Sequence, residues 1–328
     1  MNIVVVGLGS MGTRRIRLLR DRIPETAVSG ADPSAERRRR AEETYGITCF
    51  SSFCEAVQSK KFDAAFICTS PDTHCDLIRE ALQADLHVFT ELNLIDGGYG
   101  ALIDLARERG KRIFLSSTLL YRREVQEIMR LIEGKGPLMY IYHVGQYLPD
   151  WHPWENYRDF FVGRRETNGC REILAIQLPW IWKAFGAPGP GMHVSAKKIS
   201  GLDIDYADSY IVTLEHEGGN RGVLVVDVVS RKASCRLEIV GEKLHVLWDG
   251  TPDGLQSYSF EKKAFEGIPL YDSFEQDPRY AVNIIEDAYA AEIDTFLCYV
   301  AGLKTPLYTI EEDERVLKLI GTIEGESR

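Results

Sequence analysis

The chain has 328 residues, of which 45% are hydrophobic and 27% charged, and its formal net charge at pH 7 is −10. This length allows two domains with substantial cores, and the composition is that of an ordinary globular protein. The acidic balance argues against a general nucleic-acid or anionic-membrane binder, because phosphate groups attract basic surfaces.

The first part of the chain alternates short apolar strands with helices. We expect strands at residues 3–6, 27–31, 64–68, 87–90 and 113–116, with a helix after each of the first four. Such alternation predicts an α/β fold in which a doubly wound parallel sheet is covered on both faces. The ligand crevice of such a sheet lies at the carboxyl ends of its strands.

The first of these strands leads directly into the pattern G-x-G-x-x-G, formed by Gly7, Gly9 and Gly12. Gly7 permits a tight turn, Gly9 lets the backbone approach a pyrophosphate, and Gly12 lets the following helix pack against the strand. The pattern alone also occurs in ordinary loops, but a strand before it and a helix after it favour a dinucleotide site. The residues that we expect to hold the cofactor here are Gly7, Leu8, Gly9, Ser10, Met11 and Gly12.

Asp32 ends the second expected strand, where a carboxylate can accept hydrogen bonds from an adenosine ribose. The alternative is that Asp32 caps the next helix. The run Arg37 to Arg40 either binds a 2′-phosphate or forms a solvated helix face with the acidic residues that follow. Because Asp32 would repel a 2′-phosphate, we expect NAD as the cofactor, with NADP as the alternative.

After Tyr121 the pattern changes to a helix and then to longer strands with period-two alternation. These strands are expected at residues 138–147, 210–216, 222–229, 234–240 and 244–248. We therefore predict a Rossmann dinucleotide-binding domain over residues 1–120, and over residues 121–328 an α+β domain for substrate binding and oligomerisation. Its large, mostly antiparallel sheet has a face that needs cover, so we expect a homodimer or homotetramer.

Several segments together resemble the glucose-fructose oxidoreductase, inositol dehydrogenase and rhizopine-catabolism family, written Gfo/Idh/MocA. They are residues 6–12, residues 67–74 with the sequence Ile-Cys-Thr-Ser-Pro-Asp-Thr-His, and residues 80–91, 241–243 and 292–296. The resemblance implies an NAD-dependent oxidoreductase that moves a hydride to or from a carbohydrate, cyclitol or nucleotide-linked sugar. It adds to the cofactor site Thr69, Ser70, Pro71, His74 and Glu91. For His74 the alternative is a helix-start residue that bonds its own turn.

The chain departs from this family at two positions that matter for catalysis. Family members generally read Glu-Lys-Pro where this chain has Glu91, Leu92 and Asn93. Their second signature is an acid followed four residues later by a histidine, and here it falls on Glu172 and Ile176, or on Gln177 with a shift of one residue. Leucine, isoleucine and glutamine are not proton-transfer groups at neutral pH, so the chemistry has either moved or been lost.

Residues 146–154 and 168–172 combine aromatic, acidic and basic side chains just before the expected catalytic helix. Aromatic faces with a few polar groups suit a sugar ring. The catalytic candidates are Glu172, His152, Gln177 and Tyr121, and the substrate-binding candidates are Trp151 and Arg171. The alternatives are that Trp151 and Trp154 pack in a core or dimer, that His152 is a structural hydrogen-bonder, and that Arg171 pairs with Glu172.

Two other functions stay open beside the dehydrogenase: an NAD-binding sensor or subunit without turnover, and a reductase of an imine or conjugated system. The seven cysteines include no C-x-x-C pair, so we expect no metal site and reduced thiols in a cytoplasm. Met1 leads straight into a strand and no apolar stretch approaches the roughly 20 residues of a membrane span, so we expect no secretory signal and no membrane or nucleic-acid partner.

Overall fold

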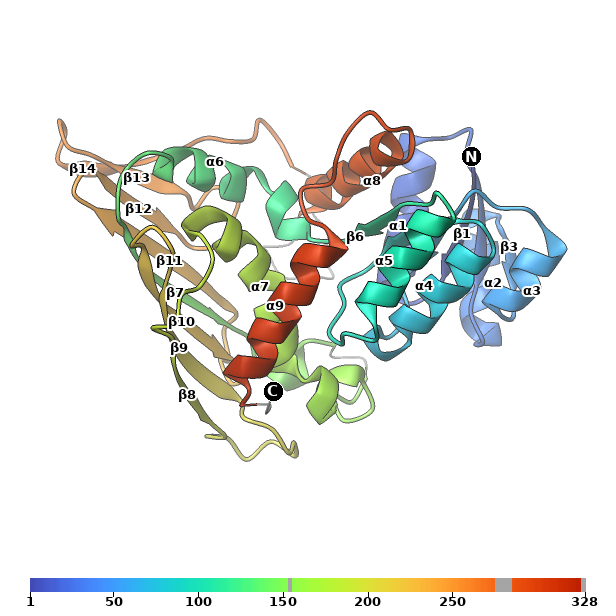
Figure 1. Ribbon diagram of the computed structural model, residues 1–328, viewed down its shortest axis with the longest axis horizontal. Helices are drawn as coiled ribbons and strands as arrows, with labels where there is room; N and C mark the ends of the chain where they lie inside the picture. Colours follow the sequence, from blue (N-terminus) through green and yellow to red (C-terminus); the bar gives the residue numbers. More distant parts are fainter. Residues whose placement is uncertain (153–154, 275–284, 326–328) are drawn as a thin grey trace. The chain divides into compact units, whose positions relative to one another are not determined.

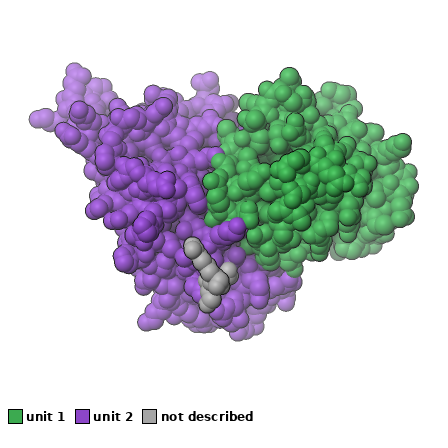
Figure 2. Space-filling view, in the orientation of Figure 1, with its two compact units in different colours: residues 1–118, 289–315 green, residues 119–288, 316–328 purple. Residues whose placement is uncertain are grey.

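The computed structural model describes residues 1–152, 155–274 and 285–325 (Figure 1). The chain forms two compact units (Figure 2). The first contains residues 1–118 and 289–315, and the second contains residues 119–288 and 316–328. The expected boundary after residue 120 lies close to the end of the first segment. The return of residues 289–315 to the amino-terminal unit differs from the prediction of one continuous second domain.

The first unit is built on a six-stranded sheet in which all strands are parallel. Its strands are β1 (Asn2–Val6), β2 (Ala27–Ala31), β3 (Thr48–Phe50), β4 (Ala64–Ile67), β5 (His87–Thr90) and β6 (Ile113–Leu115). The order β3-β2-β1-β4-β5-β6 places a topological switch point between β1 and β4, where such sheets bind ligands. The predicted doubly wound parallel sheet is confirmed. The short strand β3 was not expected.

Helices cover this sheet, and two of them begin with a side-chain cap. They are α1 (Ser10–Arg22), α2 (Ala35–Tyr45), α3 (Phe53–Ser59), α4 (His74–Gln83) and α5 (Tyr99–Glu108). Ser34 caps α2 and Ser52 caps α3, each by accepting a backbone N–H three residues later, which satisfies a donor that the first turn leaves open.

Two helices from the carboxy-terminal part of the chain, α8 (Glu286–Val300) and α9 (Ile310–Ile323), each have residues in both units. Phe296 of α8 explains why residues 289–315 belong to the first unit. Its ring packs edge-on against Phe66 and Phe89 of the parallel sheet, with ring centroids 5.2 and 5.7 Å apart. Phe89 in turn stacks on Phe66 at 4.5 Å. All three rings are fully buried, so this aromatic cluster anchors the segment by apolar burial.

The second unit contains an eight-stranded sheet in the order β14-β13-β12-β11-β7-β10-β9-β8, in which β7 and β10 run parallel and the other neighbours run antiparallel. The strands are β7 (Met139–Gly145), β8 (His193–Lys197), β9 (Ser209–Glu215), β10 (Arg221–Asp227), β11 (Ser234–Gly241), β12 (Leu244–Trp248), β13 (Gln256–Ser259) and β14 (Ala264–Gly267). This confirms the mostly antiparallel second sheet. Strands β8, β13 and β14 were not expected.

One face of this sheet is covered and the other is open. Figure 1 shows α6 (Arg123–Ile132) and α7 (Gly169–Phe185) on the same side of the sheet. Side chains on the face away from these helices occupy alternate positions along the strands. They include Met139, Ile141 and Ile211, which are 45%, 46% and 48% exposed. Among the described residues, no helix is both long and apolar enough to cross a bilayer.

Candidate functional site

The glycine turn after β1 has the geometry that a dinucleotide site requires. Gly7 adopts a φ of +89°, and its N–H donates to the carbonyl of Ala31 at 2.8 Å. A Cβ on Gly12 would lie 1.8 Å from the carbonyl oxygen of Gly7, so only glycine lets α1 pack this closely on the turn. At Gly9 the nearest atom to such a Cβ is the Arg37 Nη1, 3.9 Å away, so this position is open to a ligand.

The start of α1 fits a pyrophosphate. Gly9 is its N-cap, and within the described residues no side chain caps this 13-residue helix. The backbone N–H groups of a first turn attract anions through their own hydrogen bonds and through the helix dipole. The open position at Gly9 and this turn therefore suit the phosphates of NAD.

Asp32 is buried beside this turn and is already partly engaged. It is 3% exposed, Leu8 N donates to its Oδ2 at 2.8 Å, and Ser34 N donates to its Oδ1 at 2.8 Å. Arg37 lies near the same carboxylate, with Nη1 3.7 Å from Asp32 Oδ2. Each carboxylate oxygen can accept a second bond, so a ribose contact stays open. Ser34 and not Asp32 caps α2, which answers the alternative that the sequence left open.

The loop after β4 contains Thr69, Ser70 and Pro71, which the resemblance assigns to the nicotinamide side. Ser70 Oγ is buried and has no hydrogen-bond partner among the described residues, so it is able to form a hydrogen bond with a ligand. His74 differs from its expected role. It is 1% exposed, and its ring nitrogens face Asn93 Oδ1 and the Thr69 carbonyl, so a direct bond to a phosphate or ribose is not available. The alternative, bonding within its own turn, describes it better.

Glu91 is held by a buried ion-pair cluster that the sequence did not reveal. Arg15 Nε donates to Glu91 Oε1 at 2.6 Å, and Arg15 Nη2 donates to Glu292 Oε2 at 2.7 Å. Glu292 also accepts from the Ser117 N–H at 2.7 Å. Burial alone would lower the pKa of Arg15, but the two carboxylates outweigh it and raise that pKa. The only available signal was Arg15 on the apolar side of α1, beside the buried Ile16.

Residues 92 and 93 confirm the departure from Glu-Lys-Pro at the level of structure. Leu92 is half-buried and offers no polar group, whereas Asn93 is fully buried and hydrogen-bonded to His74 and Tyr99. The first unit therefore has no lysine at the place where the family usually has one.

In the second unit, Glu172 is a desolvated carboxyl. It lies in the first turn of α7, whose N-cap Asn168 accepts from Arg171 N at 2.8 Å. Its Oε2 is shielded from solvent and has no hydrogen-bond partner in the described part of the chain. This desolvation raises the pKa of Glu172 from 4.5 to about 8.

Arg171 serves the packing of the second unit. It is 7% exposed and forms an ion pair with Glu324, which also accepts from Asn168 Nδ2 at 2.7 Å. The substrate contact expected for Arg171 is therefore not supported, and neither is the alternative pairing with Glu172. Adjacent positions on a helix point in different directions.

Gln177 and Tyr121 are buried as well. Gln177 Oε1 accepts from the Tyr142 hydroxyl at 2.7 Å and from Trp180 Nε1 at 3.1 Å, so this oxygen joins α7 to the sheet. Tyr121 ends a short 3-10 helix and is 7% exposed. Neither residue enters our proposal for catalysis.

The aromatic segment before α7 is placed near its start. Trp151 is half-buried, and its ring lies 3.4 Å from the position of a Cβ on Gly169, one turn before Glu172. His152 Nδ1 lies 2.6 Å from Glu155 Oε1, and its ring centroid is 4.3 Å from that of Phe160. His152 thus has a carboxylate partner of its own. Trp154 is outside the described residues.

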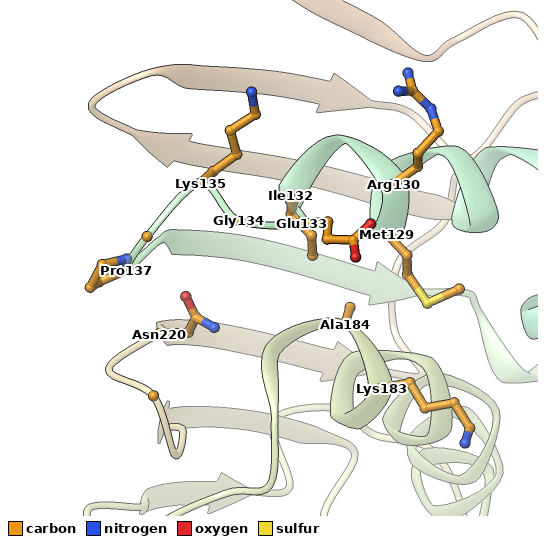
Figure 3. A pocket seen from close by; sticks show the side chains of 12 residues that line it. Met129, Arg130, Ile132, Glu133, Gly134, Lys135, Pro137, Lys183, Ala184 and Asn220 are labelled. Atoms are coloured by element: carbon orange, nitrogen blue, oxygen red, sulfur yellow. The ribbon is translucent and has the colours of Figure 1, made fainter.

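A cavity of about 590 Å³ in the second unit lies elsewhere (Figure 3). The end of α6, the turn before β7 and the end of α7 line it, with Arg130, Lys135 and Lys183 as its charged groups besides Glu133. Glu172, His152 and Trp151 are not among its lining residues. Arg130 is paired with Glu127. This cavity is therefore separate from the candidate catalytic residues.

Comparison with known proteins agrees with the first unit most strongly. Residues 1–116 match the oxidoreductase family described as having an NAD-binding Rossmann fold. Biliverdin reductase A of Mus musculus is 31% identical over 135 residues, which cover 40% of this chain and 45% of that protein. Myo-inositol 2-dehydrogenase of Thermotoga maritima is 26% identical over 97% of this chain and 94% of its own length.

Solved structures share the fold of the whole chain. The WlbA dehydrogenase from Bordetella pertussis, in complex with NADH and UDP-GlcNAcA, superposes with a TM-score of 0.80 at 18% identity and covers 99% of this chain and 95% of its own. The chain spans less than half of the mammalian biliverdin reductase that it matches. The glycine turn, the switch point between β1 and β4, and the match over residues 1–116 together show that the first 116 residues match the Gfo/Idh/MocA oxidoreductase family, with an NAD-binding Rossmann fold.

Proposed function

We propose that the protein is an NAD-dependent oxidoreductase that transfers a hydride to or from a carbohydrate, cyclitol or nucleotide-linked sugar. The observation that carries this proposal is the crevice of the first unit, where Gly9 is open, the start of α1 has no side-chain cap and Asp32 lies beside the turn. The inositol dehydrogenase of T. maritima and the UDP-GlcNAcA in the WlbA complex support a sugar-like substrate.

In this proposal, each of the cofactor-site residues in the first unit has its own task. The start of α1 binds the pyrophosphate, Asp32 accepts from the adenosine ribose, and Ser70 Oγ bonds the nicotinamide side. Glu91, fixed by Arg15, shapes the same loop. When bound, NAD supplies the hydride acceptor or donor, and the protein orients the reactants and handles the proton.

Glu172 is the proton-transfer group that we propose in the second unit. With a pKa of about 8, Glu172 is mostly protonated at neutral pH and about a tenth of it is ionised, so it is poised to donate a proton and can also accept one. Trp151, close to the start of the same helix, offers an aromatic face to the C–H surface of a sugar ring. His152 stays a secondary candidate because Glu155 already engages it.

Turnover tests this proposal directly. Absorbance at the nicotinamide band would be followed with a panel of cyclitols, sugars, sugar acids and nucleotide-linked sugars. We expect at least one to react, and Glu172→Gln to lower kcat by about 10²-fold, as general acid–base groups do. Glu166→Gln, an exposed residue shortly before α7, is the matched control and should leave kcat unchanged. Equal loss in both variants would contradict the role of Glu172.

A reductase of an imine or conjugated system is the second candidate, and two positions favour it. Leu92 and the 36% exposed Ile176 stand where the family has lysine and histidine, and a substrate that brings its own proton needs neither. Biliverdin reductase A, which the chain matches in part, is named for such a substrate. The panel should therefore include imines and biliverdin with both NADH and NADPH.

An NAD-binding protein without turnover is the remaining alternative. It predicts tight NAD binding and no reaction with any member of the panel. Leu92→Lys combined with Ile176→His separates it from a relocated site. In a relocated site the new ammonium would be desolvated without a partner, so activity should not rise. Robust sugar dehydrogenase activity in an otherwise inert chain would instead indicate a silent binding protein.

We also infer that the open face of the second sheet binds a second copy of the chain, in a homodimer or homotetramer. The exposed apolar side chains Met139 and Ile141 lie on β7 and Ile211 lies on β9, the two strands that flank β10. The seven cysteines are all free thiols, which fits the reducing cytoplasm that we propose as its location.

A further inference from the structure

A chain of buried hydrogen bonds runs through the first unit from Thr69 to α9. His74 Nε2 lies 3.0 Å from the Thr69 carbonyl oxygen, and His74 Nδ1 lies 2.6 Å from Asn93 Oδ1. Asn93 Nδ2 donates to the Tyr99 hydroxyl at 2.5 Å, and that hydroxyl donates to Asp313 Oδ2 at 2.6 Å. The four side chains that link Thr69 to α9 are each at most 1% exposed.

The chemistry of the donors and acceptors limits the protons that this chain can hold. A carbonyl oxygen only accepts, so His74 Nε2 must carry a proton toward Thr69. With Asn93 Oδ1 facing the ring, Nδ1 must carry a proton as well. His74 is then an imidazolium, and Asp313 is a carboxylate that accepts from Tyr99.

A second arrangement also pairs His74, Asn93, Tyr99 and Asp313 with one another. If the Asn93 amide turns by half a rotation, its nitrogen donates to an unprotonated His74 Nδ1 and its oxygen accepts from Tyr99. Asp313 must then be protonated, because it has to donate to the Tyr99 oxygen. In the first arrangement the Thr90 hydroxyl, 3.4 Å from Nδ1, can accept from it while donating to the Glu91 carbonyl at 3.1 Å, whereas in the second it can donate to only one of the two.

The two arrangements contain the same number of protons and have no net charge. An additional proton would leave one donor without an acceptor, and a missing proton would leave two acceptors facing each other. In a dry interior both mismatches are costly, since an unpaired buried group loses its hydration without replacement. The number of protons in this hydrogen-bond chain is therefore fixed.

We propose that His74 and Asp313 share a single proton through Asn93 and Tyr99, and that this closed chain makes His74 a positioning residue for the peptide between Thr69 and Ser70. The inference rests on the proposed function in one respect, namely that this peptide faces the cofactor. In both arrangements His74 Nε2 donates to the Thr69 carbonyl. This anchoring bond is therefore kept whether the shared proton is on His74 or on Asp313. Ser70, whose Oγ is buried without a partner among the described residues, is the residue that the anchor presents.

The surroundings bring the two ends of the chain close in basicity. Burial lowers the pKa of His74 and raises the pKa of Asp313 to about 7. The Tyr308 hydroxyl donates to Asp313 Oδ1 at 3.0 Å and works against that rise. The other charged or titratable groups that act on the chain are Glu91 and Asp72 at His74, Cys75 at Tyr99, Asp96 at Asp313, and Glu312 with Arg315 at Tyr308.

The shared proton is tested on the full-length protein by nuclear magnetic resonance, with 15N-labelled histidine and 13C-labelled aspartate. We expect His74 and Asp313 to report complementary forms, either imidazolium with carboxylate or neutral imidazole with carboxylic acid, unchanged between about pH 5.5 and 8.5. In Asp313→Asn the amide replaces the protonated carboxyl, so His74 should be neutral with Nε2–H retained. Independent titration of His74 in the wild type would overturn the proposal.

Positioning is tested by NAD affinity, measured by calorimetry without turnover. His74→Gln keeps an N–H donor for Thr69 and should bind NAD within about twofold of the wild type. His74→Leu removes the donor and should weaken binding about tenfold, the effect of one net hydrogen bond. Equal affinities for the two variants would overturn the positioning role. If the wild type itself bound no NAD, the proposed function would fail while the resonance test of the shared proton would still stand.

Discussion

Replacing Glu172 by glutamine should change how the stability of the protein depends on pH. Burial raises the pKa of Glu172 from 4.5 to about 8, so between these values the folded state holds a proton that the unfolded state has released. The free energy of unfolding then falls with pH, by about 1.4 kcal/mol per pH unit. Below pH 4.5 both states are protonated and the effect vanishes, and above pH 8 the loss is complete.

The magnitude follows from the same linkage. A shift of this size corresponds to a loss of up to about 5 kcal/mol above pH 8, and to about 3 kcal/mol between pH 5 and 7. Glutamine does not titrate, so Glu172→Gln should lose this slope and become more stable than the wild type at high pH. The measurement is the urea midpoint of unfolding at pH 5, 6, 7 and 8, with Glu166→Gln as the exposed control. Parallel curves for wild type and Glu172→Gln would refute a desolvated carboxyl at this position.

Three further predictions concern the cofactor and the partner copy. Gly9→Val should abolish NAD binding in calorimetry while the melting temperature changes little, since apart from its chain neighbours the nearest atom to the new Cβ is the Arg37 Nη1, 3.9 Å away. NAD should bind more tightly than NADP, by roughly 1–3 kcal/mol, because Asp32 would repel the 2′-phosphate. If the protein instead binds NADP more tightly, Arg37→Ala should reverse the preference. Ile211→Asp should turn an oligomer into a monomer in light scattering, whereas Thr213→Asp, on the same strand face, should shift it less, and a monomeric wild type would exclude the interface.

The parallel sheet was predictable because its strands are apolar runs separated by helix patterns and turns. β1 leads into three glycines whose spacing has one physical explanation, and the structure places Gly7 and Gly12 where any side chain would collide with backbone. β3, by contrast, has three residues and no fully buried one, so it carries too little hydrophobic signal. β8 is exposed along its whole length, so it could not be predicted from hydrophobic residues either.

The candidate site was less predictable, because burial and partners depend on residues far apart in the sequence. His74 was a candidate ligand contact because of its place after β4, yet its two ring nitrogens face Asn93 and the Thr69 carbonyl. Arg171 was expected to contact a substrate, but in the structure it pairs with Glu324, which lies more than a hundred residues further along the sequence. Glu172 was predicted from its position on the helix, but its unpartnered Oε2 and raised pKa required the packed structure.

The loop that replaces Glu-Lys-Pro is not a damaged version of it. Glu91 is held by Arg15 and Asn93 by His74 and Tyr99, so the residues on both sides of Leu92 have buried, satisfied polar partners. A segment that had merely lost a catalytic lysine would have no need of a buried asparagine, which is costly unless every hydrogen bond is made. The loop is therefore a stable alternative structure at the cofactor crevice. The missing lysine argues for a different way of handling the proton as readily as for its loss.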